Sequence, residues 1–225
     1  LLVAPADDRE QVTNLVQNGN FVGLKPYHCY APLADTNQAK IEQFAPEWMW
    51  ETCHDTNGIL MLHIMRDRAI ADERNISSLR RLCGRYPNCR VVLAHIARSF
   101  SYRWARDGLR DICGLSNVWV DTSAITETET FRCAIKVLGA KRILYGSDYP
   151  ISDLRGRCVA TGDSFSWFYA PDGDSAPDDG TGEMTLVGIE SLLCPREAAE
   201  DCGLGATGIR DIFQDNAMRL LNLDQ

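Results

Sequence analysis

Short runs of hydrophobic residues, rich in β-branched side chains, recur along the chain, and each run ends in polar residues. Runs this short and continuous are typical of strands that are buried on both faces, as in parallel sheets. The polar residues that end successive runs are separated by roughly 30 residues, the length of one strand–helix–strand unit. The runs cover residues 1–5, 21–28, 58–67, 89–99, 117–123 and 142–150.

The segments between these runs carry the signals of helices. Apolar residues recur at helical spacing in residues 76–83 and again in residues 209–221. Thr126 and Glu129 form a capping-box pattern ahead of an apolar stretch, and Gly139 stands where a helix-ending glycine is expected. The pattern therefore predicts strands that alternate with helices, followed by trailing helices near the end of the chain.

Alternating strands and helices are compatible with an open doubly wound sheet and with a closed barrel. Polar residues with catalytic chemistry follow nearly every run. This favours a barrel, because barrel enzymes collect catalytic groups from the C-terminal ends of several strands, whereas doubly wound enzymes concentrate them at one switch point. We therefore predict an α/β fold of the (β/α)8 TIM-barrel type, with residues 1–225 forming one domain.

Residues 152–185 break the pattern, because they are rich in Asp, Gly, Ser and Pro and carry a cluster of aromatic side chains. A long irregular segment after a last strand is more often a functional loop than part of the packed core. We predict a loop or insertion over the C-terminal face of the barrel. A lid over the site and a solvated insertion remain equal alternatives.

The amino-acid composition argues against several classes of function. The chain has 23 Lys and Arg against 31 Asp and Glu, a net charge of −8, which argues against nucleic acid or an anionic membrane as the partner. No apolar run approaches the roughly 20 residues of a membrane span. The nine cysteines form no CxxC motif, so we expect buried free thiols in a reducing, cytoplasmic compartment. A small-molecule substrate is the expected partner, and a homodimer is an open alternative to a monomer.

Two histidines are candidates for a functional site. His63 and His95 stand at the ends of otherwise apolar runs, LMLHIM and VVLAHIA, where an unpaired polar ring is costly to bury. Either one alone could be a core histidine that is satisfied by a neighbour. Together with Asp148 in YGSDYP they form an imidazole and carboxylate set, which suits zinc or another divalent metal.

Further polar residues near the strand ends are candidates for binding a substrate. Arginine side chains bind carboxylates through paired hydrogen bonds, and lysine can contact an anion, although salt bridges within the protein are the alternative for each. Asp121 in VDTS either orients a histidine or caps a turn. The candidate substrate-binding residues are Lys25, Tyr27, His28, Arg66 and Arg98.

The motifs LKPYH, LMLHIMRD, VVLAHIARSF, VWVDTS, RILYGSDYP and DIFQDNAMRLLNL resemble the amidohydrolase superfamily, in the amidohydrolase-2-like branch that includes lactone hydrolases and non-oxidative decarboxylases. The resemblance covers residues 1–151 and 207–223. It implies a distorted barrel with one divalent metal, zinc or alternatively manganese. His63 and Asp148 would be metal ligands, Asp148 would also be the general base, and His95 would polarise the substrate or assist the metal-bound water.

One departure from the family pattern is large. The first strand of the family carries a His-x-His pair of metal ligands, and this chain has no such motif. If GSDYP follows strand eight, residues 1–5 form strand three. We therefore predict strands three to eight of the barrel in an N-terminally incomplete chain, with loss of the metal as the alternative.

The resemblance favours a metal-dependent hydrolase of a small polar substrate, such as a lactone, a cyclic amide or a sugar-acid derivative. A decarboxylase of an aromatic or unsaturated acid is the first alternative, because two arginines near one rim suit an acid substrate. A non-catalytic barrel relative that serves binding or assembly is the second.

Overall fold

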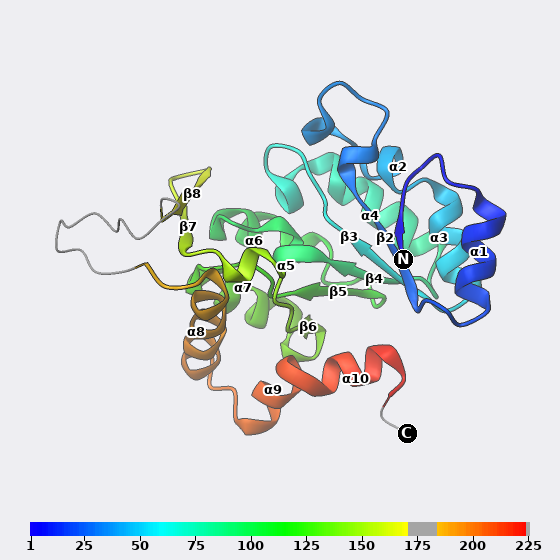
Figure 1. Cartoon of the computed structure of the whole chain (residues 1–225). Coiled ribbons are helices and arrows are strands. Elements are labelled where there is room, and N and C mark those ends of the chain that lie inside the picture. Colours follow the sequence, from blue (N-terminus) through cyan, green and yellow to red (C-terminus); the bar gives the residue numbers. More distant parts are fainter. Residues whose placement is uncertain (171–183, 224–225) are drawn as a thin grey trace.

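The computed structural model describes residues 1–170 and 184–223, and its centre is a parallel sheet (Figure 1). The six strands are hydrogen-bonded in sequence order, from β1 to β6. Each strand lies within one of the predicted hydrophobic runs, so the predicted α/β class is confirmed. The strands are β1 (Leu2–Val3), β2 (Gly23–Pro26), β3 (Ile59–Leu62), β4 (Arg90–Leu93), β5 (Val118–Asp121) and β6 (Ile143–Leu144).

Helices connect the strands and cover one face of the sheet (Figure 1). The core between them includes the fully buried side chains of Trp50, Leu79 and Phe131. The helical elements are α1 (Arg9–Gln17), α2 (Ile41–Phe44), α3 (Glu47–Asp55), α4 (Glu73–Arg85), α5 (Ala94–Arg98), α6 (Tyr102–Gly108), α7 (Thr128–Leu138), α8 (Val187–Asp201), α9 (Ala206–Arg210) and α10 (Asn216–Leu221).

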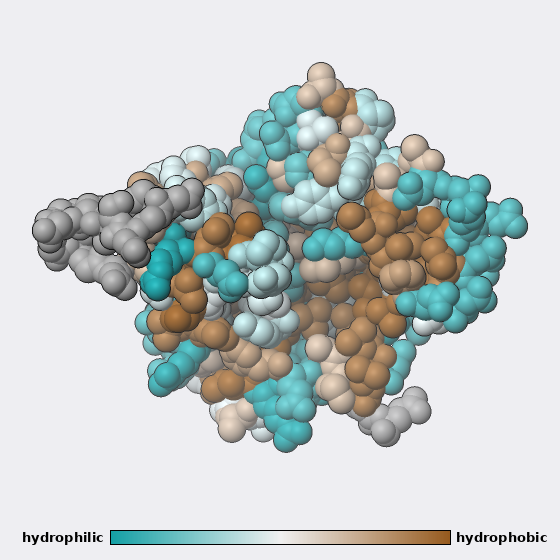
Figure 2. Space-filling view, in the orientation of Figure 1, coloured by the Kyte–Doolittle hydropathy of each residue, from teal (hydrophilic) through white to brown (hydrophobic). Residues whose placement is uncertain are grey.

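The opposite face of the sheet is covered less completely. Ile59, Met61 and Trp119 on this face are only partly buried, and Leu220 of α10 packs into the same cluster. Figure 2 shows hydrophobic side chains gathered across the middle of the view, where Figure 1 shows the strands. Within the described residues, β1 and β6 each pair with one neighbour, so these six strands form an open sector of sheet.

The start of α7 differs from the prediction. Thr126 does not cap the helix, because its hydroxyl donates to the carbonyl of Cys158 at 2.8 Å and accepts from the Cys158 amide at 3.1 Å. The helix begins at Thr128 without a side-chain cap. The predicted capping box is therefore wrong, whereas Gly139 ends the helix with a φ of 79°, as predicted.

Cys158, the hydrogen-bond partner of Thr126, belongs to a β-hairpin. This hairpin lies within residues 152–185, the segment predicted to be irregular. Strands β7 (Gly156–Ala160) and β8 (Phe165–Tyr169) pair in antiparallel fashion. Asp163 in the connecting turn accepts from the Trp104 indole at 3.1 Å and pairs with Arg68 at 2.9 Å. The hairpin is therefore held against α6 rather than being a solvated insertion. Residues 171–183 of the predicted loop lie outside the described residues.

All nine cysteines are free thiols. Among the described residues, no helix combines the length and the apolar character that crossing a membrane requires.

Candidate active site

The strand ends meet at one edge of the sheet and surround a cavity of about 400 Å³. The register explains this convergence, because Leu62 pairs with Leu93 and Asp121 pairs with Leu144, so the residues that follow each strand are neighbours in space. Most of the predicted site residues line the cavity, and they follow four of the six strands, β2, β3, β4 and β6. They are Tyr27, His28, His63, His95, Arg98 and Asp148.

Three imidazole rings lie together on one side of the cavity. The ring centroid of His63 lies 4.8 Å from that of His95 and 5.5 Å from that of His28. Nδ1 of His63 is 3.2 Å from the hydroxyl of Tyr27. Burial, and then the positive groups around it, lower the pKa of His63 to about 2. His63 is therefore a neutral ring at physiological pH, able to serve as a ligand or hydrogen-bonding group.

This pKa predicts an acid-sensitive fold. Between pH 6.5 and about 2 the unfolded chain binds a proton at His63 that the folded chain does not bind, so the free energy of unfolding decreases as the pH falls through that window. At pH 4.5 the loss from this residue is about 2–3 kcal/mol. Urea unfolding of the wild type and of His63→Gln at pH 7.5 and 4.5 measures it, and the variant should lose less stability than the wild type.

His54→Gln is the matched control, because His54 lies on α3, away from the cavity, and accepts from the Asn88 amide. Equal losses of stability in the wild type and in His63→Gln would contradict the assignment of the acid sensitivity to His63.

The element α5 after β4 is a left-handed turn. His95, Ile96, Ala97 and Arg98 all have φ between 47° and 58°, a region that costs roughly 1–2 kcal/mol per residue for side chains other than glycine. The turn places both His95 and Arg98 at the cavity. Asp121 of β5 holds the start of this turn, because its carboxylate accepts a hydrogen bond from the His95 amide at 2.8 Å. Backbone strain of this kind persists where the surrounding structure enforces it, which is typical of functional sites.

Arg98 is a half-buried cation at the cavity wall. Its guanidinium lies 5.5 Å from the centroid of the Phe165 ring, and its Nε is buried without a hydrogen-bond partner among the residues that the structure describes. Burial lowers the pKa of Arg98 below its usual range. Among the described residues no carboxylate forms an ion pair with it. Within residues 1–170 and 184–223, the cavity thus holds a positive charge without an ion-pair partner.

An aromatic wall closes one side of the cavity. Alternate residues of β8 face inward, because successive side chains of a strand point to opposite sides. Phe165, Trp167 and Tyr169 all line the cavity, and the rings of Trp167 and Tyr169 are parallel at 5.4 Å. Phe100 packs edge-on against Trp167. The aromatic residues are apparent in the sequence, but the strand is not among the predicted elements, although the period-2 spacing in FSWFY is a signal for it.

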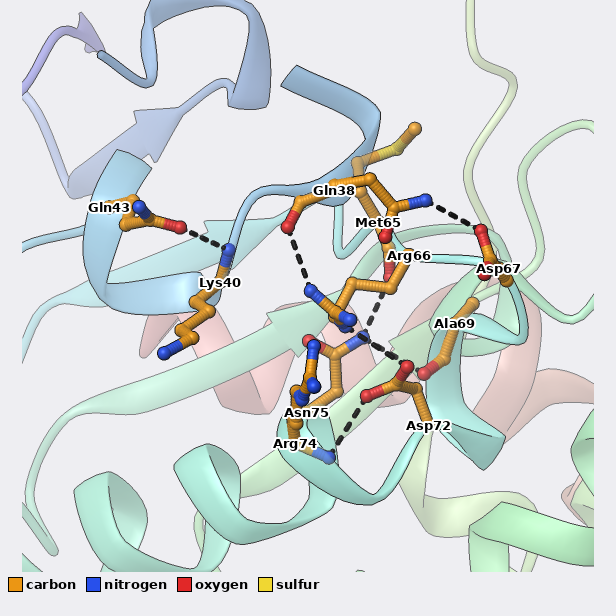
Figure 3. A network of polar contacts seen from close by, with 10 residues as sticks. All are labelled: Gln38, Lys40, Gln43, Met65, Arg66, Asp67, Ala69, Asp72, Arg74 and Asn75. Atoms are coloured by element: carbon orange, nitrogen blue, oxygen red, sulfur yellow. Dashed lines mark hydrogen bonds and ion pairs between the residues drawn. The ribbon is translucent and has the colours of Figure 1, made fainter. Parts of the chain in front are cut away.

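Two predicted substrate-binding residues do not reach the cavity. Arg66 instead pairs with Asp72 at 3.0 Å and donates to the carbonyl of Gln38 at 2.8 Å (Figure 3). Asp72 caps α4, so Arg66 fixes a loop to the start of that helix. Lys25 lies on β2 and does not line the cavity, although its charge contributes to lowering the pKa of His63. We correct Arg66 from a substrate contact to a structural ion pair.

Asp148 is half-buried at the cavity wall and has a φ of 57°. Burial raises the pKa of Tyr27, and the nearby charge of Asp148 raises it further. The carboxylate is thus close to the phenol as well as to the cavity. A carboxylate in this position has the chemistry of a general base.

The predicted divalent metal would bind His63 and Asp148, and both side chains line the cavity. In the part of the chain that the structure describes, however, no group of three or more His, Cys, Asp or Glu side chains is arranged to hold a metal ion. Nδ1 of His63 is engaged with Tyr27. The donors present do not make up a complete metal site, so the metal stays a prediction and no reaction step below depends on it.

Comparison with known proteins places these features in a family. L-fucono-1,5-lactonase of Burkholderia ambifaria is 26% identical over 179 residues, which cover 73% of this chain and 57% of that protein. The chain therefore spans less than two thirds of the length of this curated relative.

Solved structures show the same fold. An amidohydrolase from Burkholderia multivorans has been solved in two crystal structures, one with bound HEPES and one with bound zinc. Each is 14% identical in sequence, and each match covers 96% of this chain and 71% of that chain. The TM-scores are 0.61 for the structure with HEPES and 0.58 for the structure with zinc. A 2,6-dihydroxybenzoate decarboxylase from Rhizobium is 17% identical, covers 96% of this chain and 67% of that chain, and has a TM-score of 0.57. The model of the amidohydrolase family matches residues 11–223, and since this is nearly the whole chain, the protein belongs to that family.

Proposed function

We propose that this cavity hydrolyses a small lactone or cyclic amide that bears a carboxylate. The observation that carries the proposal is Arg98, a half-buried cation without an ion-pair partner among the described residues, at the wall of a cavity that also holds Asp148. A buried guanidinium gains most from a ligand that supplies the missing negative charge. The similarity to a lactonase supports the choice of reaction.

Arg98 and Asp148 have separate roles in this reaction. Arg98 binds the carboxylate of the substrate and fixes its orientation. Asp148 accepts the proton of the water molecule that attacks the ring carbonyl, and the proton then passes to the leaving ring oxygen or nitrogen, so the ring opens with net addition of water. Holding the substrate between a fixed cation and a base lowers the entropic cost of the attack.

Decarboxylation of an aromatic acid is the second candidate, and the aromatic wall favours it. Phe165, Trp167 and Tyr169 present flat apolar surfaces to the cavity, and such surfaces suit the face of a conjugated ring. A structural relative is a decarboxylase of a dihydroxybenzoate. Release of carbon dioxide rather than ring opening would identify this reaction.

The experiment is a turnover assay of the protein with a panel of carboxylated lactones, sugar-acid lactones and hydroxybenzoates. Ring opening is followed by proton release, and decarboxylation by carbon dioxide release. We expect lactone hydrolysis, which Asp148→Asn should reduce by about 10²- to 10⁴-fold, because it removes the base while keeping the shape of the side chain. Turnover that is unchanged in Asp148→Asn would refute the role of Asp148, and no turnover of any panel member would favour the non-catalytic alternative.

The predicted metal is tested in the same assay by adding zinc or manganese to chelator-treated protein. Stimulation in the wild type that is lost in His63→Gln would support His63 as a ligand, and equal stimulation in both would reject it.

The nine free thiols support the reducing, cytoplasmic setting that we propose for the protein.

A further inference from the structure

One oxygen of Asp121 accepts three hydrogen bonds from His95 and Ser123. Oδ1 accepts from the His95 amide at 2.8 Å, from the Ser123 amide at 3.1 Å and from the Ser123 hydroxyl at 2.5 Å. Asp121 and Ser123 are both buried. This carboxylate therefore ties the end of β5 to the start of the left-handed turn that carries His95 and Arg98.

Ser123 in turn contacts the ring of His95 twice. Nδ1 of His95 lies 2.9 Å from the carbonyl oxygen of Ser123 and 3.0 Å from its hydroxyl oxygen. The carbonyl oxygen has no proton to give, and the single proton of the hydroxyl points to Asp121. Both oxygens can only accept from the ring, so Nδ1 must carry the hydrogen.

We propose that Asp121 and Ser123 are positioning residues that hold His95 in the Nδ1–H tautomer, with the lone pair of Nε2 directed to the cavity. Asp121 holds the left-handed turn, and Ser123 selects the tautomer. The ring of His95 lines the cavity while Nδ1 is engaged with Ser123, so Nε2 is the nitrogen that remains for a ligand. The inference deepens the proposed function and rests on it for its catalytic meaning, whereas the tautomer itself does not depend on any substrate.

This assignment decides between the two roles that sequence reasoning left open for His95. A neutral ring without a hydrogen on Nε2 cannot donate to a substrate carbonyl, so it cannot polarise that carbonyl. It can accept a hydrogen bond from water and orient the molecule for attack. His95 therefore assists the water molecule, in the cavity that the base Asp148 also lines.

The same arrangement couples His95 to Arg98. The two residues are the ends of one strained turn, so loss of the Asp121 anchor displaces the water-orienting ring and the carboxylate-binding cation together. A structural role confined to the core would instead change stability and leave the ring tautomer unaffected.

The test uses protein labelled with ¹⁵N-histidine, without substrate, and long-range ¹H–¹⁵N correlation spectra at pH 7.5. The His95 signals are identified by their absence in His95→Gln. In the wild type we expect a protonated Nδ1 and a bare Nε2. In Asp121→Ala we expect a mixture of tautomers, and Asp121→Asn, whose amide oxygen can still accept, should restore the Nδ1–H form.

A protonated Nε2 with a bare Nδ1 in the wild type would overturn the proposal, even if the alanine variant does not fold. Retention of a pure Nδ1–H tautomer in folded Asp121→Ala would also overturn it. If a substrate has been identified, turnover should fall by about 10- to 100-fold in Asp121→Ala. Because the spectra need no substrate, failure of the tautomer assignment and failure of the proposed hydrolysis are distinguished.

Discussion

Replacing Arg98 with methionine is expected to stabilise the ligand-free protein and at the same time to remove its affinity for carboxylates. Arg98 is half-buried, burial lowers its pKa, and its Nε has no hydrogen-bond partner in the described part of the chain. A methionine of similar length removes the cost of holding an unpaired charge away from water, which is worth about 1–2 kcal/mol. The melting temperature should rise by about 2–8 °C.

Arg98→Met also removes the positive charge that we expect to bind the carboxylate of a ligand. Truncating one partner of a buried charge pair costs about 2–5 kcal/mol, which corresponds to a loss of affinity of about 30- to 4,000-fold. Calorimetric titration with benzoate and gluconate as carboxylate probes measures the loss. Arg98→Lys should recover part of the affinity, because lysine keeps the charge but not the planar pair of donors.

Arg66→Met is the matched control, because Arg66 follows His63 by the same three residues that separate Arg98 from His95. Its side chain is paired with Asp72 and with the carbonyl of Gln38, so its loss should destabilise the protein by about 1–3 kcal/mol and leave carboxylate affinity unchanged. A lower melting temperature in Arg98→Met, or unchanged binding of both probes, would show that Arg98 is a structural residue of the same kind.

These two arginines show where prediction from the sequence stops. Both stand three residues beyond a histidine that follows a strand, and the local pattern gives them the same role. Their roles are decided by neighbours in space that the local pattern does not specify. Gln38 and Asp72 meet Arg66, whereas the described residues bring no carboxylate into an ion pair with Arg98.

The strands, by contrast, could be predicted because their signal is local. Continuous β-branched runs specify buried strands, and the residues at their ends follow directly, which is why His63, His95 and Asp148 were found together. The left-handed turn could not be predicted, since Ile96 and Ala97 have no preference for positive φ. Its first residue, His95, donates its amide hydrogen to Asp121 on the next strand, a contact that the local sequence does not reveal.

The hairpin escaped prediction for a related reason. Glycine and aspartate in residues 152–185 signal a loop, and the pairing of β7 with β8 outweighs that signal only because the hairpin also contacts Thr126, Trp104 and Arg68. Tertiary contacts overrode a local compositional preference. The consequence for function is large, because this hairpin supplies the aromatic wall of the cavity.

Gly23→Ala is expected to cause a large loss of stability, for a reason that also affects the site. A Cβ atom at Gly23 would lie 2.0 Å from the carbonyl oxygen of Ile59, its partner on β3. Backbone on a neighbouring strand cannot yield as a flexible side chain can, so β2 must separate from β3. We expect a loss of about 3 kcal/mol or more and a fall in melting temperature of at least about 6 °C.

Gly84→Ala makes the same chemical change where it should have the opposite effect. Gly84 is exposed near the end of α4, and a Cβ atom there has no described atom within 4 Å. Alanine in a helix is favoured over glycine by about 0.5–1 kcal/mol, so this variant should be slightly more stable than the wild type. Urea unfolding of both variants measures the difference, and equal stabilities would show that β2 can shift without cost.

The position of Gly23 links this packing constraint to the cavity. Tyr27 and His28 follow β2 directly and His63 follows β3, so separation of the two strands breaks the contact of 3.2 Å between Tyr27 and His63. In the fraction of Gly23→Ala that remains folded at low temperature, benzoate affinity should therefore fall, whereas Gly84→Ala should bind benzoate as the wild type does. Normal binding by folded Gly23→Ala would mean that the strand ends are positioned by their loops rather than by the pairing of β2 with β3.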